Sequence, residues 1–174
     1  MSDRPSERTI DEVDVLVEAW RRERPDLDVA PLGVLSRVSR LARHLDLARR
    51  EAFAAHDLEP WEFDVLAALR REGAPYTLSP GRLLQVTLVT SGTMTNRIDR
   101  LETKGLVARV PDPHDGRGVQ VVLTGAGRSR VDDALTDLLA HERDILSALP
   151  SADRDELADL LRRLTVPFDR AGDA

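Results

Sequence analysis

Residues 91–104 combine side chains that can read DNA with the spacing of a short amphipathic helix. Asn96 and Arg100 suit paired hydrogen bonds to the edges of adenine and guanine, and hydroxyl groups suit a thymine methyl group or a phosphate oxygen. The hydroxyl residues of this window are Ser91, Thr93 and Thr95. The apolar residues share the opposite side: Met94, Ile98 and Leu101. The window therefore predicts a helix that packs on a core by one side and offers the other to duplex DNA.

A second candidate for DNA contact follows in the stretch VARVPDPHDGRGVQVVLT. It predicts two short strands, Val107–Pro111 and Val119–Leu123, joined by a turn rich in Pro, Asp and Gly. At the tip, Arg117 can reach a minor groove or its phosphates, and Asp115 can brace that arginine. A recognition helix followed directly by a basic-tipped ribbon is the pattern of a winged helix.

Arg97 stands apart from the residues that suit DNA. It borders the apolar side of its helix and is turned away from Asn96. A long cation at this place points into the groove between the helix and its neighbours rather than at DNA. This placement suggests a second function for the same helix.

Apolar periodicity and cap residues predict the elements that position these side chains. The expected helices are 10–24, 31–56, 59–72, 79–86, 91–104, a long helix after Thr124 and a last helix after Pro150. The expected division of the chain is a flexible N-terminus at 1–9, N-terminal ligand and dimerisation helices at 10–58, a DNA-binding module at 59–124 and C-terminal dimerisation helices at 125–174.

The fold class that follows is mainly α with a small β-hairpin wing: a winged helix-turn-helix with N- and C-terminal dimerisation helices. The terminal helices bury their apolar stripes best against a second copy of the chain, which predicts a homodimer. Two-fold symmetry then places two recognition helices about one DNA turn apart, roughly 34 Å, and predicts a pseudo-palindromic operator.

The charge of the 174-residue chain is unevenly distributed around a total of −6. Residues 79–130 hold eight basic and four acidic side chains, a local charge of +4, so the other residues carry −10. Because the local field governs the approach to phosphates, the acidic total does not exclude a nucleic-acid partner.

Composition excludes several kinds of site. The chain has no cysteine, which excludes disulfides, thiolate metal ligands and thiol-based peroxide sensing. Its four histidines are scattered, and neither an HExxH pattern nor a glycine-rich phosphate loop is present. We therefore expect no catalytic residues, no metal site and no cofactor. The sequence also lacks a long apolar run and a signal-peptide pattern, which predicts a cytoplasmic protein with no membrane partner.

The run LLQVTLVTSGTMTNRIDRLETKGLVARVPDPHDGRGVQVVLT resembles the MarR family of winged-helix regulators, whose wing commonly reads DPxDRRxxxVxLT. The matching wing residues are Asp112, Pro113, Asp115, Arg117, Val121, Leu123 and Thr124. Gly116 replaces the first arginine of the family's pair, which removes one wing cation and should weaken backbone contacts. The helix order is similar over nearly the whole chain, and the resemblance implies a ligand-responsive repressor.

A narrower resemblance, to the urate-responsive PecS-like subgroup, implies a ligand site. That subgroup has a tryptophan on an extra first helix, an aspartate before the DNA module, an arginine in the recognition helix and an arginine at the start of the wing. The corresponding residues here are Trp20, Asp64, Arg97 and Arg109. The resemblance thus implies that urate binds these four residues and weakens DNA binding.

The chemistry of these side chains fits a planar monoanion such as urate. An indole can cover its face, two guanidinium groups can pair with its charge and carbonyl groups, and a carboxylate can accept from ring N–H groups. Since Arg97 and Arg109 flank the recognition helix, ligand binding there can be linked to DNA release. Without ligand, we expect Asp64 to pair with Arg97 or Arg109.

Other readings stay open for these residues. Trp20 also fits dimer-core packing, Asp64 a structural ion pair, Arg97 a phosphate contact and Arg109 an outward wing cation.

The effector and the partner also have alternatives. The effector can be another small anion, such as trans-aconitate, citrate or a phenolic acid, and a winged helix can bind a protein instead of DNA. A pH effect through His44 or His141 near a dimer interface is a further hypothesis.

Overall fold

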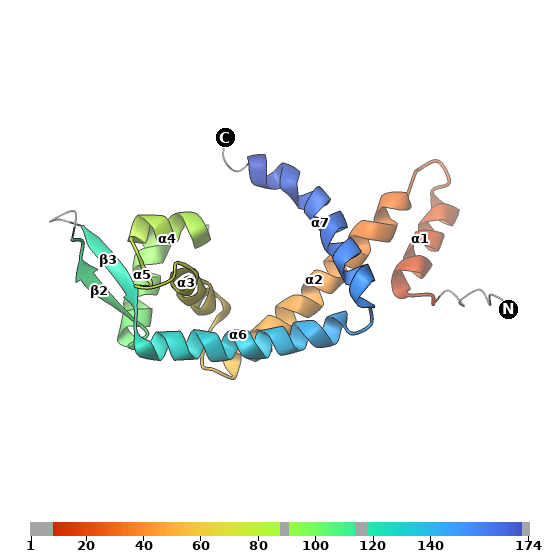
Figure 1. Ribbon diagram of the computed structural model, residues 1–174. Helices are drawn as coiled ribbons and strands as arrows, with labels where there is room; N and C mark the ends of the chain where they lie inside the picture. The colour runs from red at the N-terminus through yellow and green to blue at the C-terminus, as the bar shows by residue number, and fades with distance from the viewer. Residues whose placement is uncertain (1–8, 88–90, 114–117, 172–174) are drawn as a thin grey trace. The chain divides into compact units, whose positions relative to one another are not determined.

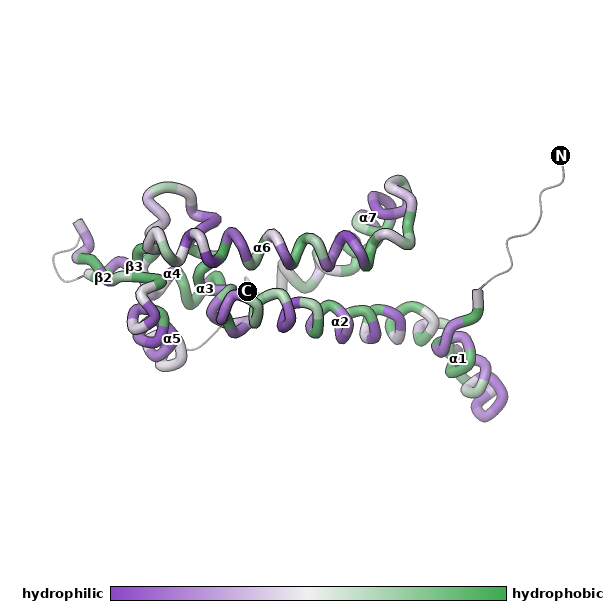
Figure 2. Tube along the Cα trace, turned by 90° about the horizontal axis from the view of Figure 1, so that it is seen from below, coloured by the Kyte–Doolittle hydropathy of each residue, from purple (hydrophilic) through white to green (hydrophobic). Residues whose placement is uncertain are grey.

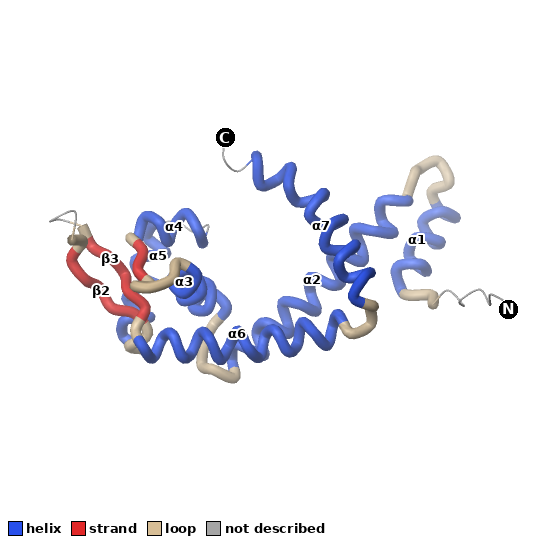
Figure 3. The backbone as a smooth tube through the Cα atoms, in the orientation of Figure 1, coloured by secondary structure: helices blue, strands red, loops and turns tan. Residues whose placement is uncertain are grey.

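The computed structural model describes residues 9–87, 91–113 and 118–171. Figure 1 shows the elements in chain order and Figure 3 separates helices from strands. The helices are α1 (Glu12–Glu23), α2 (Ala30–Ala54), α3 (Pro60–Arg71), α4 (Pro80–Thr87), α5 (Ser91–Thr103), α6 (Gly125–Leu146) and α7 (Ser151–Ala171). The strands are β1 (Thr77–Leu78), β2 (Val107–Pro111) and β3 (Val119–Leu123). Each predicted helix is present with ends shifted by a few residues, and the two predicted strands have the observed bounds.

The chain forms two compact units, Met1–Leu47 and Ala48–Ala174, and the division falls inside α2. In the first unit, α1 begins with a capping box in which Asp11 and Asp14 accept each other's backbone N–H groups. A small core made by Val13, Val17 and Val29 lies between α1 and the start of α2.

The second unit contains a three-stranded antiparallel sheet in the order β1-β3-β2. Val107 pairs with Leu123 and Pro111 with Val119, so β2 and β3 form the expected hairpin. The two-residue strand β1 adds to the other edge of β3, a pairing that the sequence pattern did not predict because two residues cannot display an alternation. The wing is thus one part of a three-stranded sheet.

The core of the second unit joins α3, α4, α5, α6 and the sheet. Phe53 of α2 stacks on Phe63 of α3 with ring centroids 4.1 Å apart. At the start of α6, Gly127 permits a close approach: a Cβ there would lie 2.0 Å from the carbonyl oxygen of Leu106. The connection between α5 and β2 and the start of α6 are therefore packed backbone to backbone.

Several helices also carry large apolar side chains on their exposed sides, and Figure 2 shows hydrophobic and hydrophilic stretches alternating along α2 and α6. In α2 the exposed residues are Val34, Leu35, Val38, Leu41 and Leu47. In α6 and α7 they include Leu135, Leu139, Leu160, Leu161 and Leu164. None of the described helices is long and apolar enough to cross a membrane.

Candidate nucleic-acid interface and effector site

Helix α5 has the two sides that its sequence predicts. Met94, Ile98 and Leu101 are buried to at least 99 %. The polar residues on its outer side are exposed: Thr93, Thr95, Asn96, Asp99, Arg100 and Thr103. Ser91 opens the helix. Burial of the apolar side fixes which side chains of α5 face solvent and are available to a duplex.

The predicted wing-tip contacts, Asp115 and Arg117, lie outside the described residues. What is described of the wing reaches from Val107 to Pro113 and resumes at Gly118. Within it, the Nε2 of Gln120 donates to the carboxylate of Asp112, so the two strands are also joined near their outer ends by side chains.

Arg100 is held in place by two residues near the start of α3. One guanidinium nitrogen lies 2.9 Å from Oε1 of Glu59, and its Cζ is 4.8 Å from the ring centroid of Trp61. The Nε1 of Trp61 also donates to Glu59, over 2.7 Å. Hydrogen bonds from Trp61 and then from Arg100 lower the pKa of the Glu59 carboxyl below its usual value.

Arg97 approaches the same indole from the next turn of α5. Its Cζ lies 5.3 Å from the ring centroid of Trp61, within the range of a cation–π interaction. An open depression of about 420 Å³ lies here, lined by Trp61, Gly92, Thr93, Asn96, Arg97 and Arg100. The prediction that Arg97 points towards a neighbouring helix is confirmed, and the neighbour is α3.

Asp64 does not form the ion pair that we expected. Its carboxylate lies 3.1 Å from a guanidinium nitrogen of Arg49 on α2 rather than beside Arg97 or Arg109. The reason is the position of Asp64 on α3, where its half-exposed side chain lies beside Arg49 near the end of α2. The expected pair with either arginine was wrong for this state of the protein.

Arg109 in β2 instead pairs with two carboxylates of the recognition helix. One guanidinium nitrogen is 2.5 Å from Oδ1 of Asp99, and the other donates to Oε2 of Glu102. The backbone N–H of Arg109 donates to Oε1 of Glu102 over 3.0 Å. Burial by itself would lower the pKa of the Arg109 guanidinium. The hydrogen bonds to Asp99 and Glu102 outweigh this effect and raise that pKa above its usual value.

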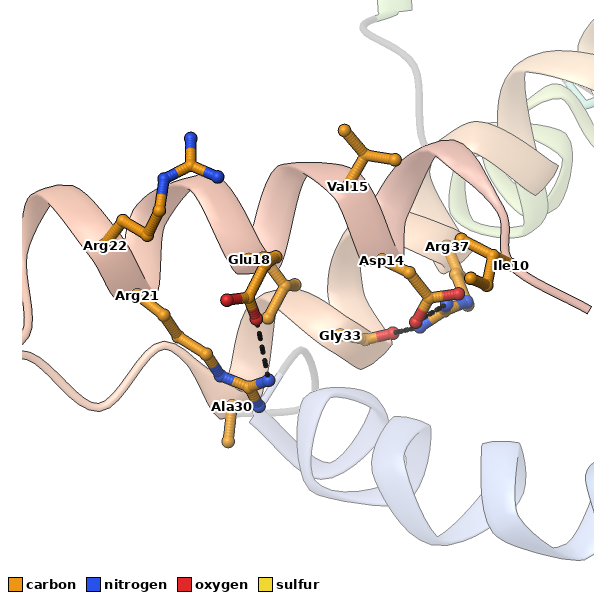
Figure 4. A pocket seen from close by; sticks show the side chains of 10 residues that line it. Ile10, Asp14, Val15, Glu18, Arg21, Arg22, Ala30, Gly33 and Arg37 are labelled. Carbon is orange, nitrogen blue, oxygen red and sulfur yellow. Dashed lines mark hydrogen bonds and ion pairs between the residues drawn. The ribbon is translucent and has the colours of Figure 1, made fainter. Parts of the chain in front are cut away.

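Trp20 belongs to the first unit, where its side chain is 48 % exposed on α1. A pocket of about 650 Å³ lies between α1 and α2 in this unit, and its labelled lining is shown in Figure 4. Trp20 is not among its lining residues. Four charged groups of the pocket are paired with each other, Arg37 with Asp14 and Arg21 with Glu18.

Lys104, at the end of α5, contacts the buried carboxylate of Glu62 on α3. Its Nζ lies 2.9 Å from Oε2 of Glu62 and 3.1 Å from the carbonyl oxygen of Asp57. Glu62 is fully buried, and its Oε1 has no hydrogen-bond partner. Since Glu62 is buried, removal of the Lys104 cation would leave an uncompensated charge in the core between α5 and α3.

The sequence analysis missed several of these residues. Trp61, Glu59, Glu102 and Lys104 were not singled out as functional residues. The Arg100–Glu59 and Lys104–Glu62 contacts join residues 41 and 42 positions apart, so no helical or strand spacing signals them. Among the described residues, no group of three or more His, Asp or Glu side chains is placed to hold a metal ion.

Comparison with known proteins places these features in a family. A model of the MarR family matches residues 56–118. The chain is similar to the transcriptional regulator PecS of Dickeya dadantii (strain 3937), with 39 % identity over 153 residues, 88 % of this chain and 92 % of that protein. It is also similar to the multiple antibiotic resistance protein MarR of Escherichia coli (strain K12), with 34 % identity over 58 % of this chain and 66 % of that one.

Solved structures with the same fold include regulators with and without DNA. Apo MarR from E. coli superposes with a TM-score of 0.66 and 27 % identity, covering 79 % of this chain and 98 % of that chain. A mutant of the same protein complexed with operator DNA gives a TM-score of 0.64 and 26 % identity, covering 83 % and 96 %. BpsR of Bordetella bronchiseptica, whose DNA binding is described as regulated by 6-hydroxynicotinic acid, gives a TM-score of 0.63 and 26 % identity, covering 76 % and 92 %.

Proposed function

The chain belongs to the MarR family of transcriptional regulators and is not an enzyme, and we propose that it binds a pseudo-palindromic DNA operator as a homodimer whose affinity falls when a small anion binds. Residues 59–124 act as the DNA-binding module. The site of action is the cytoplasm, and the regulator acts as a repressor.

The observation that carries DNA binding is the division of α5 into a buried and an exposed side. Because Met94, Ile98 and Leu101 are buried, Asn96 and Arg100 must face outwards. An asparagine and an arginine one turn apart suit adjacent base pairs in a major groove. The related E. coli MarR complexed with operator DNA supports this use of the module.

The homodimer is supported by the apolar side chains that α2, α6 and α7 leave exposed. A monomer seldom exposes so many large aliphatic side chains, whereas a two-fold interface buries them. The same symmetry presents two copies of α5 to successive major grooves on one side of the duplex.

The test of DNA binding uses a duplex selected by the wild-type protein from a random-sequence pool. Asn96→Ala and Arg100→Ala should each weaken binding by about ten- to a hundredfold, since each removes paired contacts to a base. The matched control is Arg163→Ala, an exposed arginine of α7, which should change affinity little. Failure of the wild-type protein to select any duplex would favour a protein-binding role, and unchanged binding of both α5 variants would show that base recognition does not depend on Asn96 and Arg100.

For the effector we favour urate, bound through Asp64, Arg97 and Arg109, with Trp20 as a further ligand residue. Two guanidinium groups suit an anion, and a carboxylate suits the ring N–H groups of urate better than it suits a tricarboxylate such as citrate or trans-aconitate. The regulation of BpsR by 6-hydroxynicotinic acid supports a planar heteroaromatic effector in this family. Phenolic acids are the second candidate class.

Calorimetric titration with urate is the direct test. We expect saturable binding near two sites per dimer, weakened in Asp64→Asn and in Trp20→Leu, with Asp155→Asn as the matched control on α7. Absence of heat, with DNA binding intact, would reject urate and direct the search to tricarboxylates and phenolic acids.

A further inference from the structure

Arg109 joins the wing to the recognition helix through charge. Its guanidinium contacts Asp99 and Glu102 on α5, and its backbone N–H donates to Glu102 as well. One side chain therefore closes on two carboxylates that belong to successive turns of the helix. Its exposed fraction is 30 %, lower than that of either acid.

The two acids lie where they would oppose DNA binding if they were unpaired. Asp99 is 58 % exposed and shares the outer side of α5 with Asn96 and Arg100. The guanidinium of Arg100 is itself paired with Glu59. Without Arg109, α5 would thus carry two uncompensated negative charges, that of Asp99 on its outer side, close to the phosphates of a bound duplex, and like charges repel.

We propose that Arg109 is a positioning residue for DNA recognition: it neutralises Asp99 and Glu102 and holds β2 against α5, and the effector weakens DNA binding by taking Arg109 away from these two carboxylates. This inference rests on the proposed function, because it needs α5 to face DNA and an anion to bind Arg109. It adds the coupling step between the two ligands.

The competition has a simple electrostatic basis. An anion bound to Arg109 satisfies the guanidinium, so Asp99 and Glu102 lose their shared cation and β2 loses its side-chain link to α5. The anion and the operator then favour opposite arrangements of the same three residues, which is a reciprocal coupling between their binding free energies.

The first arm of the test measures DNA affinity without any effector, by fluorescence anisotropy on the selected duplex. Arg109→Gln should weaken binding by about tenfold, and more at about 50 mM than at about 200 mM salt, because the unpaired acids repel phosphates through the solvent. Adding Asp99→Asn and Glu102→Gln to Arg109→Gln should restore affinity to within about threefold of wild type.

Two outcomes of this arm would overturn the neutralising role. If the triple variant binds as weakly as Arg109→Gln while its thermal unfolding matches wild type, Arg109 acts by direct contact with DNA. If Arg109→Gln binds as well as wild type, the two acids do not oppose DNA binding.

The second arm uses urate with wild type and with the Asp99→Asn, Glu102→Gln double variant. By calorimetry the double variant should bind urate at least as tightly, since the competing carboxylates are gone. Saturating urate should then weaken its DNA binding by less than a third of the factor measured for wild type. Equal factors in the two proteins would overturn the competition. A wild type that does not bind urate would instead reject the effector assignment, and the first arm would still decide the role of Arg109.

Discussion

In the second unit, buried side chains from α3, α4, α5, α6 and the sheet form one continuous core. In the first unit, the core cluster of buried side chains among residues 9–47 consists of Val13, Val17 and Val29. The first unit also exposes apolar residues along α2, including Val34 and Leu35 at 56 % and 57 %. A core of three valines contributes little against the entropy of ordering two helices. The comparison indicates that the first unit, with its smaller core, depends more on association than the second.

The ion pairs of the two units differ in the same way. In the second unit Lys104 pairs with a fully buried carboxylate, Glu62. In the first unit Arg37 pairs with Asp11, whose side chain is 48 % exposed. Water and salt screen the exposed pair, while the buried carboxylate depends on its partner. The winged helix is therefore sensitive to single changes that the N-terminal helices should tolerate.

The largest effect should come from breaking the buried pair. Lys104→Met leaves Glu62 without a cation and should lower the free energy of unfolding by about 3 kcal/mol, measured in urea. In the Lys104→Met, Glu62→Gln double variant no buried charge remains, and at least half of this loss should return. Equal losses in the single and double variants would mean that the contact is only packing.

A matched pair of core truncations compares the two units directly. Val65 of α3 and Val13 of α1 are 0 % and 2 % exposed. Val65→Ala should cost about 2 kcal/mol, because its surroundings cannot collapse, and Val13→Ala about 1 kcal/mol or less. Urea unfolding with residue-resolved hydrogen exchange separates the units. A larger cost at Val13 would contradict the view that the first unit has the weaker core.

The association of the first unit can be tested on its exposed stripe. Leu35→Ser should raise the dimer dissociation constant by about tenfold, because a leucine buried at an interface contributes more than 1 kcal/mol. Sedimentation equilibrium measures this. Val86→Ser, at a similarly exposed valine of α4, is the control and should leave the dimer unchanged. A dissociation constant unchanged by Leu35→Ser would mean that the dimer interface does not include this part of α2.

The smallest effect should come from the exposed pair. Hydrogen bonds from Arg37 lower the pKa of Asp11 from 3.8 to about 2. Since the folded pKa is below the unfolded one, the stabilisation by this carboxylate is present above pH 4 and is lost as the pH falls towards 2. An NMR titration of the Asp11 carboxyl should show the low value, and Arg37→Met should return it towards 3.8. An ordinary value in wild type would mean that the pair is not formed in solution.

Much of the secondary structure could be predicted because it depends on local periodicity and caps. The 3.6-residue spacing of Met94, Ile98 and Leu101 predicted the buried side of α5, and Pro-Asp-Gly chemistry predicted the turn between β2 and β3. Strand β1 could not be predicted, because a two-residue strand exists only through its pairing with β3.

The partners of the charged residues could not be predicted in the same way. Asp64 was assigned to an arginine of the recognition helix or wing, and it pairs with Arg49. Arg109 was assigned to a ligand, and it pairs with Asp99 and Glu102. A long side chain can reach several oppositely charged groups, and the choice among them depends on how the helices pack.

The sequence by itself determined the order of the helices and of the two hairpin strands, the buried and exposed sides of α5 and the resemblance to the MarR family, since each follows from patterns within a few neighbouring residues. Only the tertiary structure decided the partners of three cations. Trp61 and Glu59 contact Arg100, the buried Glu62 pairs with Lys104, and Arg109 joins the wing to the recognition helix. Electrostatic and cation–π contacts act over a few ångströms in space, and residues distant in the chain come within that range only when the core has packed.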